Sequence, residues 1–416
     1  MKVAVVNCGS SSIRYEVFAA GGLSRLVEGR VENIGSADGR LLQSRRRADG
    51  TMEETSLRRP LRNHREGFDF MASASEGDRI LGAGSDLLGI GHRVVHGGER
   101  FREPALVDDE ALGAIRELIP LAPLHNPSNL LGIEVARSRF PGVPQVAVFD
   151  TAFHHALPPR ARHYAVPHDL YARHHVRRYG FHGISHSYVA GEASRHLGKP
   201  AAEANLVTLH LGNGASAAAV QGGRSIDTSM GMTPLAGLVM GPRCGDIDPA
   251  LPFHLMRHAG MSAEEVENLL ETRSGLKGIC GRSDMREILD RAAGGDDLAG
   301  LAVEMFAYRV KKYIGAYVAV LGRTDAVVFT GGIGENAPAV RERACEGLEH
   351  LGIAIDPARN ASAAGAVSEI QQVGAPLKIL VIRTDEELEI ARQTVRTIEK
   401  AGSGRPRPSE PRGGPA

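Results

Sequence analysis

The chain has 416 residues, of which 42% are hydrophobic and 24% charged, a balance typical of globular proteins. At about 150 residues per domain, this length predicts two or three domains. The 49 basic and 49 acidic side chains give a net charge of zero, which excludes the broad basic surface of a general nucleic-acid binder, so no nucleic-acid partner is expected.

Cysteine use and hydropathy indicate a cytoplasmic protein. The four cysteines are far apart and form neither a CxxC motif nor a disulfide scaffold. The apolar run at the start is too short for a signal peptide, and no stretch reaches the ~18 apolar residues of a membrane helix. We therefore expect a cytoplasmic location and no membrane partner.

The N-terminal part begins with two short β-branched runs. Val3–Val6 and Ile13–Phe18 are separated by a Gly/Ser-rich turn, which predicts a β-hairpin. Residues 35–84 are polar and rich in Arg, with poor periodicity, so they predict only strands and loops without clear limits.

Three further elements follow before residue 150. The two Asp at 108 and 109 begin a predicted helix that ends near Ile119. Asn126 is predicted to cap a second helix, which has Pro127 at its first position and runs towards Arg139. Residues 143–149 predict a strand that ends directly before Asp150.

The opening organisation recurs about 200 residues further on. After a helix predicted between Ser185 and Gly198, Asn205–Leu211 reads as an apolar strand, and a glycine-rich turn leads into a second strand at 217–220. We interpret the two copies as the opening hairpins of two related α/β domains. A chance likeness of two glycine-turn hairpins is the alternative.

The C-terminal part contains a long helix, two strands and a final helix. Apolar residues from Val303 to Leu321 recur at spacings of three and four, which predicts an amphipathic helix. Strands are predicted at Ala326–Thr330 and Lys378–Ile382. Thr384 and Glu387 match a capping box, so a helix should follow. Residues 401–416 contain four Gly and four Pro, and we expect a disordered tail there.

Three glycine-rich turns, at residues 7–12, 212–216 and 331–336, each follow an apolar strand. Such turns let backbone amides approach an anion, so three of them indicate a phosphorylated ligand. No GK[ST] sequence is present, which argues against a Walker-type NTPase. The pattern from Gly332 to Ala337, with Asp356 about 20 residues on, leaves a dehydrogenase as an alternative.

Seventeen histidines raise the question of a metal site. His92 and His96 are four apart, as are His182 and His186, but the sequence contains no HExxH motif, so zinc is a minor alternative. Four other histidines are expected at the surface: His154, His155, His174 and His175.

Several single polar residues lie in tight, glycine-flanked segments: Arg93 in GHRVVHGGE, His125 in APLHNPSN, Asp150 in VFDTAFH, His182 in RRYGFHGISH, His210 in TLHLGNGAS and Arg243 in GPRCGDIDP. Together with NCGSSS, GGIGEN and RTDEELEIA, these segments resemble the acetate kinase family of the acetate and sugar kinase/actin superfamily. The resemblance covers nearly the whole chain except the C-terminal tail.

The resemblance implies an α/β protein of two duplicated ribonuclease-H-like domains of the actin-like ATPase fold, with an interdomain cleft. Residues 1–150 plus 384–400 would form the N-terminal acyl and magnesium domain, and 151–383 the nucleotide-binding domain. The implied reaction is the reversible, direct in-line transfer of the ATP γ-phosphoryl group to acetate, which gives acetyl phosphate and ADP. A homodimer is the implied assembly.

The resemblance also implies roles for residues at matching positions. The catalytic residues would be Asp150, His182 and Arg243. Substrate would be bound by Arg93, Val95, Leu124, His125, Phe181 and Pro234. Nucleotide phosphates would contact Ser10, Ser12 and Arg14, and also His210, Leu211, Gly212, Asn213 and Gly214. The adenosine side would be formed by Asp284, Met285, Arg286, Gly332, Ile333, Gly334, Glu335 and Asn336. Mg²⁺, with Mn²⁺ as an alternative, would be held by Asn7 and Glu386.

Two rivals share this fold. One is a kinase for propionate or another short-chain acid, which the specificity constants for acids of different length would separate. The other, from a different class, is an actin-like nucleotide-driven binding protein, which would bind ATP without acetate-dependent turnover.

Overall fold

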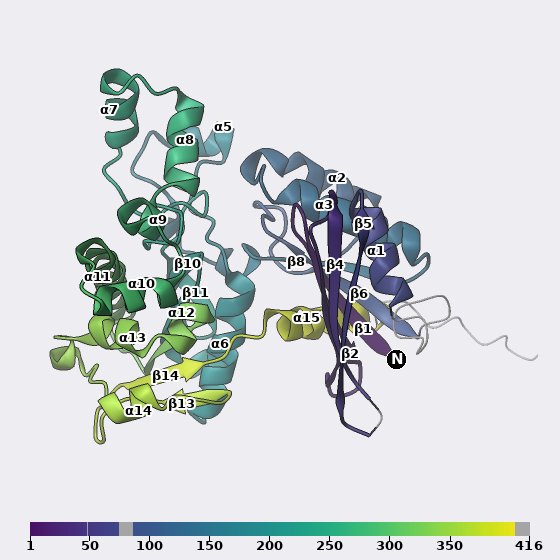
Figure 1. Ribbon diagram of the computed structural model, residues 1–416. Coiled ribbons are helices and arrows are strands. Elements are labelled where there is room, and N and C mark those ends of the chain that lie inside the picture. The colour runs from purple at the N-terminus through teal and green to yellow at the C-terminus, as the bar shows by residue number, and fades with distance from the viewer. Residues whose placement is uncertain (48, 75–85, 404–416) are drawn as a thin grey trace, which may run out of the picture. The chain divides into compact units, whose positions relative to one another are not determined.

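The computed structural model describes residues 1–47, 49–74 and 86–403, and the chain divides into two compact units (Figure 1). Unit 1 comprises Met1–Phe149 and Glu387–Ala416, and unit 2 comprises Asp150–Glu386. The sequence-based limits, 1–150 with 384–400 and 151–383, stay a prediction of independently folding domains.

Unit 1 is built on an eight-stranded mixed sheet with the order β5-β4-β3-β2-β1-β6-β8-β7. Its strands are β1 (Lys2–Cys8), β2 (Ile13–Ala19), β3 (Arg25–Glu32), β4 (Ser36–Arg46), β5 (Met52–Leu61), β6 (Leu87–Val94), β7 (Ala105–Leu106) and β8 (Gln145–Phe149). The predicted opening hairpin is confirmed as the antiparallel pair β1–β2, with Asn7 opposite Arg14. Strands β1, β6 and β8 are parallel to one another.

Helices cover both faces of this sheet. They are α1 (His64–Ser73), α2 (Asp109–Glu117), the 3-10 turn η2 (Ile119–Leu121), α3 (Asn126–Arg139) and α15 (Glu386–Ser403). Ile90 of β6 shares a core cluster with Val135 and Ala136 of α3. Gly89 and Gly91 point to the opposite face, where a Cβ would meet Ile398 and Thr394 of α15 at 2.3 and 2.2 Å. These glycines therefore let α15 approach the sheet closely.

Two sequence-based predictions in unit 1 need correction. Asn126 does not cap α3 but is its first residue, and its amide instead exchanges hydrogen bonds with the backbone N–H and C=O of His96, both at 3.1 Å. Helix α1, within the stretch left without clear limits, begins after Asn63, whose side chain accepts from the Glu66 N–H.

A further correction concerns the first residues of the expected C-terminal tail. Residues 401–403 continue α15, so their predicted disorder is wrong, while 404–416 lie outside the described residues.

Unit 2 repeats the sheet plan of unit 1. Its six strands have the order β11-β10-β9-β12-β14-β13. They are β9 (Asn205–Leu211), β10 (Ala215–Gln221), β11 (Arg224–Thr228), β12 (Ala326–Thr330), β13 (Val367–Glu369) and β14 (Lys378–Ile382). The relations β9–β10 antiparallel, β9–β12 parallel, β12–β14 parallel and β13–β14 antiparallel match those of β1–β2, β1–β6, β6–β8 and β7–β8. The interpretation of two related α/β domains is therefore confirmed.

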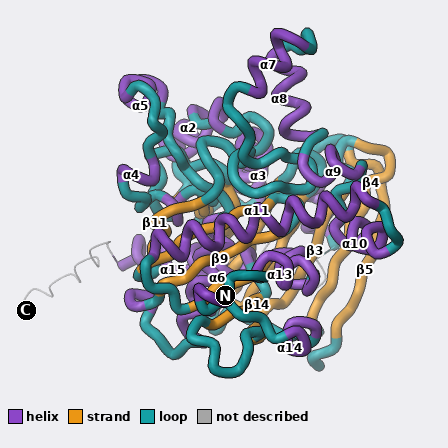
Figure 2. The backbone as a smooth tube through the Cα atoms, turned by 90° about the vertical axis from the view of Figure 1, so that its left-hand side faces the viewer, coloured by secondary structure: helices purple, strands orange, loops and turns teal. Residues whose placement is uncertain are grey.

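The helices of unit 2 are α4 (Pro159–Arg162), α5 (His168–His174), α6 (Gly183–His196), α7 (Leu251–His258), α8 (Ala263–Thr272), α9 (Gly275–Cys280), α10 (Met285–Ala293), α11 (Asp297–Leu321), α12 (Gly331–Asn336), α13 (Pro338–Cys345) and α14 (Pro357–Ala361), with 3-10 turns η3 (Ala152–His154), η4 (Ala201–Glu203) and η5 (Glu349–Leu351). Helix α11 runs across the strands of this unit (Figure 2). Its predicted apolar stripe is confirmed, because Val303, Phe306, Val310 and Ile314 are fully buried.

Three features of unit 2 differ from the predictions. Residues 331–336 form the short helix α12 rather than a turn. His154 is fully buried rather than at the surface, with its ring nitrogens bound to Ser225 Oγ and the Phe181 carbonyl. Asp356 caps α14 by accepting from the Ala358 and Arg359 N–H groups, which removes the acidic residue that supported a dehydrogenase.

Among residues 1–47, 49–74 and 86–403, no helix has the length and hydropathy that would suit a membrane crossing.

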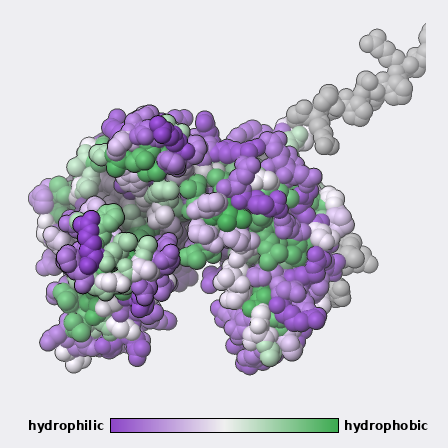
Figure 3. Space-filling model, turned by 90° about the horizontal axis from the view of Figure 1, so that it is seen from above, coloured by the Kyte–Doolittle hydropathy of each residue, from purple (hydrophilic) through white to green (hydrophobic). Residues whose placement is uncertain are grey.

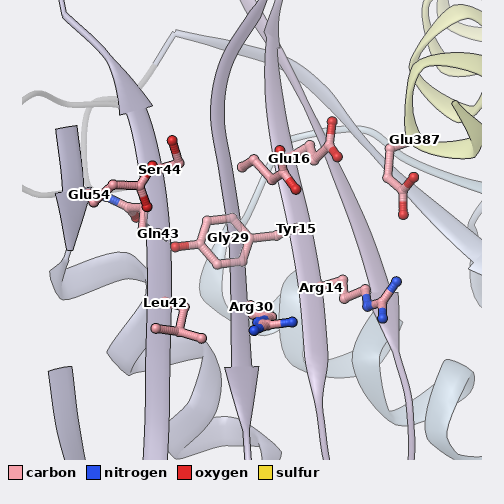
Figure 4. Close-up of a pocket in the computed structure, with 11 residues that line it drawn as sticks. Arg14, Tyr15, Glu16, Gly29, Arg30, Leu42, Gln43, Ser44, Glu54 and Glu387 are labelled. Carbon is pink, nitrogen blue, oxygen red and sulfur yellow. Dashed lines mark hydrogen bonds between the residues drawn. The ribbon is translucent and has the colours of Figure 1, made fainter. Parts of the chain in front are cut away.

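Gly29 of β3 provides a test of packing in unit 1. It lies opposite Tyr15 of β2, and a Cβ at residue 29 would be 2.3 Å from the Tyr15 Cζ atom (Figure 4). Tyr15 is buried and donates to Gln43 Oε1 at 2.6 Å, so its ring cannot move away freely. Gly29→Ala should destabilise the protein by about 1–3 kcal/mol, measured as a lower urea midpoint.

Gly113→Ala is the matched control, because Gly113 lies within α2 and a Cβ there meets nothing within 4 Å. It should be neutral or stabilising by up to about 1 kcal/mol. Equal midpoints for the two variants would contradict the packing argument.

Candidate active site

In unit 1, the predicted site residues gather where the parallel strands β1 and β6 end. Asn7 lies near the end of β1, and Arg93 near the end of β6. Ligands of open α/β sheets bind beyond the carboxyl ends of such strands. Asn129 of α3 joins these ends, since its Oδ1 accepts from the Val95 N–H at 3.1 Å and its Nδ2 donates to the Cys8 carbonyl at 2.9 Å.

Asn126 and Asn129 are structural residues that the sequence reasoning did not single out. Both lie in the segment APLHNPSN, so the same motif that drew attention to His125 also contained them. Through Asn126 the loop before α3, which carries Leu124 and His125, is held against the end of β6. Leu124 is 67% exposed in unit 1, so its expected contact with a substrate methyl stays a prediction.

The first glycine-serine turn is closed by backbone contacts. The Gly9 N–H donates to the Ser12 carbonyl at 2.9 Å, and the Gly9 carbonyl accepts from His64 Nε2 at 2.8 Å. Ser10 is exposed and Ser12 half-buried. The turn is therefore fixed by the backbone, and the Ser10 side chain faces solvent.

Arg14 borders a pocket of about 570 Å³ on the face of strands β2–β5 and the start of α15 (Figure 4). The charged residues that line it are Arg14, Arg30, Glu16, Glu28, Glu54 and Glu387. Arg14 thus lies among carboxylates, and its expected contact with nucleotide phosphate stays a prediction.

In unit 2, four predicted site residues are brought together. The rings of His182 and His210 stack, with centroids 4.4 Å apart and an angle of 29° between their planes. A Cβ on Gly214 would lie 3.3 Å from His182 Cε1 and Nε2 and 3.6 Å from Arg243 Nη1. Two imidazoles and a guanidinium therefore surround one stretch of glycine backbone, an arrangement suited to a phosphoryl group.

The backbone at His182 is strained. His182 has φ 56° and ψ 24°, the left-handed region that non-glycine residues enter at a cost. The next residue, Gly183, donates its N–H to the Asp150 carbonyl at 2.9 Å, and a Cβ there would lie 2.2 Å from that oxygen. This close approach holds the His182 side chain at the start of α6.

The β9–β10 hairpin presents the second glycine-rich turn. His210 lies opposite Ser216, and the Gly212 N–H donates to the Gly214 carbonyl at 3.0 Å. The Asn213 carbonyl accepts from the Gly241 N–H at 2.9 Å, which joins the turn to the loop that carries Arg243. Leu211 is buried, so its contribution to a ligand is confined to the backbone.

Arg243 is held along one edge of its guanidinium. Its Nε lies 3.1 Å from Glu271 Oε2 of α8, and its Nη1 lies 3.8 Å from the Met240 sulfur. Burial raises the pKa of Glu271, and the charge of Arg243 counteracts that shift. The Glu271 contact was not foreseen from the sequence, because the two residues lie on separate elements.

The loop around Arg243 is further held by Asp246. One carboxylate oxygen of Asp246 accepts from the Gly237 N–H at 2.7 Å, and the other accepts from Tyr313 Oη at 2.7 Å. Pro234 is half-buried and lies shortly before Gly237, one of the partners of Asp246.

Asp150 follows β8 directly and is 1% exposed. Its charge acts on the neighbouring buried His154, whose pKa burial lowers to about 4 while Asp150 opposes the shift. The His154 ring in turn holds the Phe181 carbonyl, the residue before His182.

The expected adenosine side consists of two segments, one at the start of α10 and one in α12. Asp284 caps α10 and pairs with Arg286 at 2.6 Å, and both are exposed, whereas the Met285 side chain is buried. In α12, Glu335 Oε1 accepts from the N–H groups of Gly331 and Thr384, at 2.9 and 3.1 Å. The Glu335 carboxylate therefore fixes backbone.

The other residues of α12 offer a ligand their backbone groups and the side-chain amide of Asn336. Gly332 and Asn336 are exposed, while Ile333 and Gly334 are buried. Asn336 donates to the Gly332 carbonyl at 2.9 Å.

The two expected metal ligands suit magnesium chemically. Asn7 and Glu386 are half-buried and offer an amide and a carboxylate oxygen, and Mg²⁺ prefers oxygen donors and keeps several waters. Within the described parts of the chain, no group of three or more His, Cys, Asp or Glu could hold a metal ion.

Comparisons with known proteins identify the family. The model of the Acetokinase family matches residues 2–392. An acetate kinase of Syntrophobacter fumaroxidans is 58% identical over 405 residues, which span 97% of this chain and 98% of the relative. An acetate kinase of Streptomyces coelicolor is 50% identical over 402 residues, 97% of this chain and 98% of the relative.

Solved structures give the same result. The crystal structure of Porphyromonas gingivalis acetate kinase matches with a TM-score of 0.89 and 40% identity, over 95% of this chain and 99% of that one. A propionate kinase from Francisella tularensis subsp. tularensis SCHU S4 matches with a TM-score of 0.87 and 41% identity, over 94% and 98% of the two chains. These likenesses confirm the expected fold class, and the chain is a kinase that belongs to the acetokinase family.

Proposed function

We propose that this chain catalyses the reversible transfer of the γ-phosphoryl group of ATP to acetate, which gives acetyl phosphate and ADP. The observation that carries the proposal is the grouping of His182, His210 and Arg243 around the Gly214 backbone. The acetate kinases among the relatives support acetate as the acceptor.

The chemistry requires few covalent steps from the protein. An acetate oxygen attacks the γ-phosphorus, the bond between that phosphorus and the oxygen bridging to the β-phosphate breaks, and ADP leaves. Acetate is already ionised near neutral pH, so no general base is needed. The protein must align the reactants and stabilise charge on the migrating group, and a donor for such charge is typically worth ~3–4 kcal/mol.

Each predicted residue takes a role in this scheme. Arg243 and His182 stabilise the migrating phosphoryl group, with His210 and the turn around Gly214 beside it. Arg93 and His125 bind acetate, with Val95, Leu124, Phe181 and Pro234 around its methyl group. Asp150 is a buried carboxylate that orients these groups rather than removing a proton.

Nucleotide and metal complete the proposal. The turn at 10–14, the turn at 210–214 and the segments at 284–286 and 332–336 contact ATP. Asn7 and Glu386 hold Mg²⁺, or Mn²⁺, with water ligands. The ion supplies charge neutralisation on the phosphates when it is bound. A reaction that uses ATP also supports the expected cytoplasmic location.

Propionate is the second candidate acceptor. The similarity to a propionate kinase structure, at 41% identity, favours it as a slower substrate. One methylene in an apolar pocket changes discrimination by only ~1–3 kcal/mol, so a pocket for acetate does not exclude propionate.

A homodimer is also proposed, with α11 and α7 at the interface. Figure 3 shows apolar patches on a mostly hydrophilic surface. The exposed stripe of α11 consists of Leu298, Leu301, Met305 and Tyr308, and the exposed large apolar residues of α7 are Leu251, Phe253 and Met256. The α11 stripe has helical spacing and lies opposite the buried one, which suits a second copy of this chain.

Arg243→Lys should lower kcat by about 100-fold or more, because Lys keeps the charge but loses the planar pair of donors. The rate of acetyl phosphate formation would be measured with the melting temperature. Arg323→Lys is the control, because the Arg323 side chain is 76% exposed and its partner Asp325 keeps its contacts with Lys199 Nζ and the Asn205 N–H. Equal rates in both variants would remove the assigned role of Arg243.

A panel of carboxylates tests the acceptor. Hydroxylamine traps acyl phosphates, so the rate of hydroxamate formation with acetate, propionate and butyrate reports kcat/KM for each acid. We expect acetate first and propionate about 10–200-fold lower. ATP binding without acid-dependent product would favour the actin-like binding protein instead.

Tyr308→Glu should weaken the homodimer, because it places a charge in the exposed stripe of α11. Sedimentation equilibrium would show a shift towards monomer. Val373→Glu, at a residue that is 84% exposed on a loop, is the matched control and should leave the assembly unchanged. An unchanged dimer in both variants would place the interface elsewhere.

A further inference from the structure

We infer that His186 is a positioning residue that acts through Ser216: it fixes the tautomer of His182 so that His182 Nε2–H faces the Gly214 backbone and Arg243. The inference deepens the proposed function, because it rests on His182 stabilising the migrating phosphoryl group. The sequence had suggested His186 only as half of a zinc pair, and the catalytic scheme above leaves it without a role.

A continuous chain of hydrogen bonds carries the inference. Thr208 Oγ1 lies 2.8 Å from His186 Nδ1, His186 Nε2 lies 2.8 Å from Ser216 Oγ, and Ser216 Oγ lies 2.9 Å from His182 Nδ1. Thr208, His186 and Ser216 are fully buried. This series of hydrogen bonds therefore runs from the interior of unit 2 to the half-buried ring of His182.

The direction of the chain follows from counting protons. His186 is neutral, because burial lowers its pKa well below the ordinary value and the charges of His154 and His210 act in the same direction. It therefore carries one N–H. A buried hydroxyl also needs an acceptor for its single hydrogen.

One arrangement satisfies every group in the chain. Thr208 Oγ–H donates to His186 Nδ1, His186 Nε2–H donates to Ser216 Oγ, and Ser216 Oγ–H donates to His182 Nδ1. The reverse arrangement would need a different acceptor for the Thr208 hydroxyl hydrogen, and His186 Nδ1 is its hydrogen-bond partner in this structure. With Nδ1 of His182 accepting, the proton of the neutral ring is on Nε2.

The His182 Nε2 atom faces the site. It would lie 3.3 Å from a Cβ on Gly214, next to Arg243 Nη1 at 3.6 Å from the same point. His182 is thereby a neutral hydrogen-bond donor beside the fixed positive charge of Arg243. Protonation of His182 at Nδ1 requires every hydrogen bond in this series to reverse, so the series opposes that protonation.

Other titratable groups surround this chain and enter its pH dependence. The His154 ring of η3 contacts the His186 ring edge-on, with centroids 5.6 Å apart. His210 of β9 stacks on His182 at 4.4 Å. Arg243 adds a positive charge, and Asp150, which acts on His154, adds a negative one.

Two variants test the chain with little change in volume. Ser216→Ala removes the hydroxyl next to His182, and Thr208→Val removes the hydroxyl that begins the chain while keeping its shape. Nitrogen-15 NMR of histidine-labelled protein reports the tautomer and the pKa of His182. A steady-state pH profile reports kcat and KM for acetate.

In the unaltered protein we expect the Nε2–H tautomer of His182. In Ser216→Ala the two tautomers should mix, the pKa of His182 should rise, and kcat should fall about 10–100-fold with KM for acetate nearly unchanged. Thr208→Val should change the tautomer, the pKa of His182 and kcat in the same direction but by less. Ser216→Thr, which keeps the hydroxyl, should give the same values as the unaltered protein.

An unchanged nitrogen-15 spectrum and an unchanged kcat in Ser216→Ala would overturn the inference, as would an Nδ1–H tautomer in the unaltered protein. The spectrum needs no turnover, so it judges the hydrogen-bond chain even if acetate proves not to be the substrate. Failure of the proposed function would instead appear as absent acetate-dependent turnover in the unaltered protein.

Discussion

The His182 ring lies against the backbone of Gly214, beside the Arg243 guanidinium, and several contacts within unit 2 hold these groups in place. A side chain at residue 214 would enter the space between the His182 ring and the Arg243 guanidinium. The strained backbone of His182, the stack on His210 and the Glu271 contact of Arg243 each hold one member of the group. Groups fixed before the reaction need little reorganisation when charge develops, which is the main source of catalysis in phosphoryl transfer.

The repeated sheet plan explains why the site residues occur where they do. In each unit three parallel strands end at the same edge, and a polar residue lies one position before the end of some of them: Asn7 and Arg93 in unit 1, and His210 in unit 2. The hairpin turn beside the first strand of each set is rich in small residues. A duplicated fold thus supplies two glycine-rich turns, and the proposed phosphoryl transfer depends on the side chains placed beside them.

The sequence predicted those parts of the structure that depend on local residue patterns. Alternating apolar residues and glycine turns indicated both hairpins, and the spacing of Val303, Phe306 and Val310 indicated α11. Tertiary contacts decided the rest. Asn126 binds the His96 backbone instead of capping its helix, and His154 is buried by contacts with Ser225 that no local pattern contains.

The candidate site shows the same division. The family motifs predicted His182, His210 and Arg243 as site residues. The distances between them depend on how α6, the β9–β10 hairpin and the loop before α8 pack together. The residues behind them, Ser216 and Glu271, were missed because hydroxyl and carboxylate residues in a strand or helix carry no distinctive pattern.

The central claim is that these groups act on the migrating phosphoryl group rather than on the nucleotide. It is tested most directly by titrating ADP, and then ADP with aluminium fluoride and acetate as a mimic of the migrating group, into the unaltered protein and His182→Ala. The account predicts ADP dissociation constants within about two-fold of each other, and a loss of about 100-fold or more in affinity for the mimic. Equal loss of affinity for both ligands, or no loss for the mimic, would contradict it.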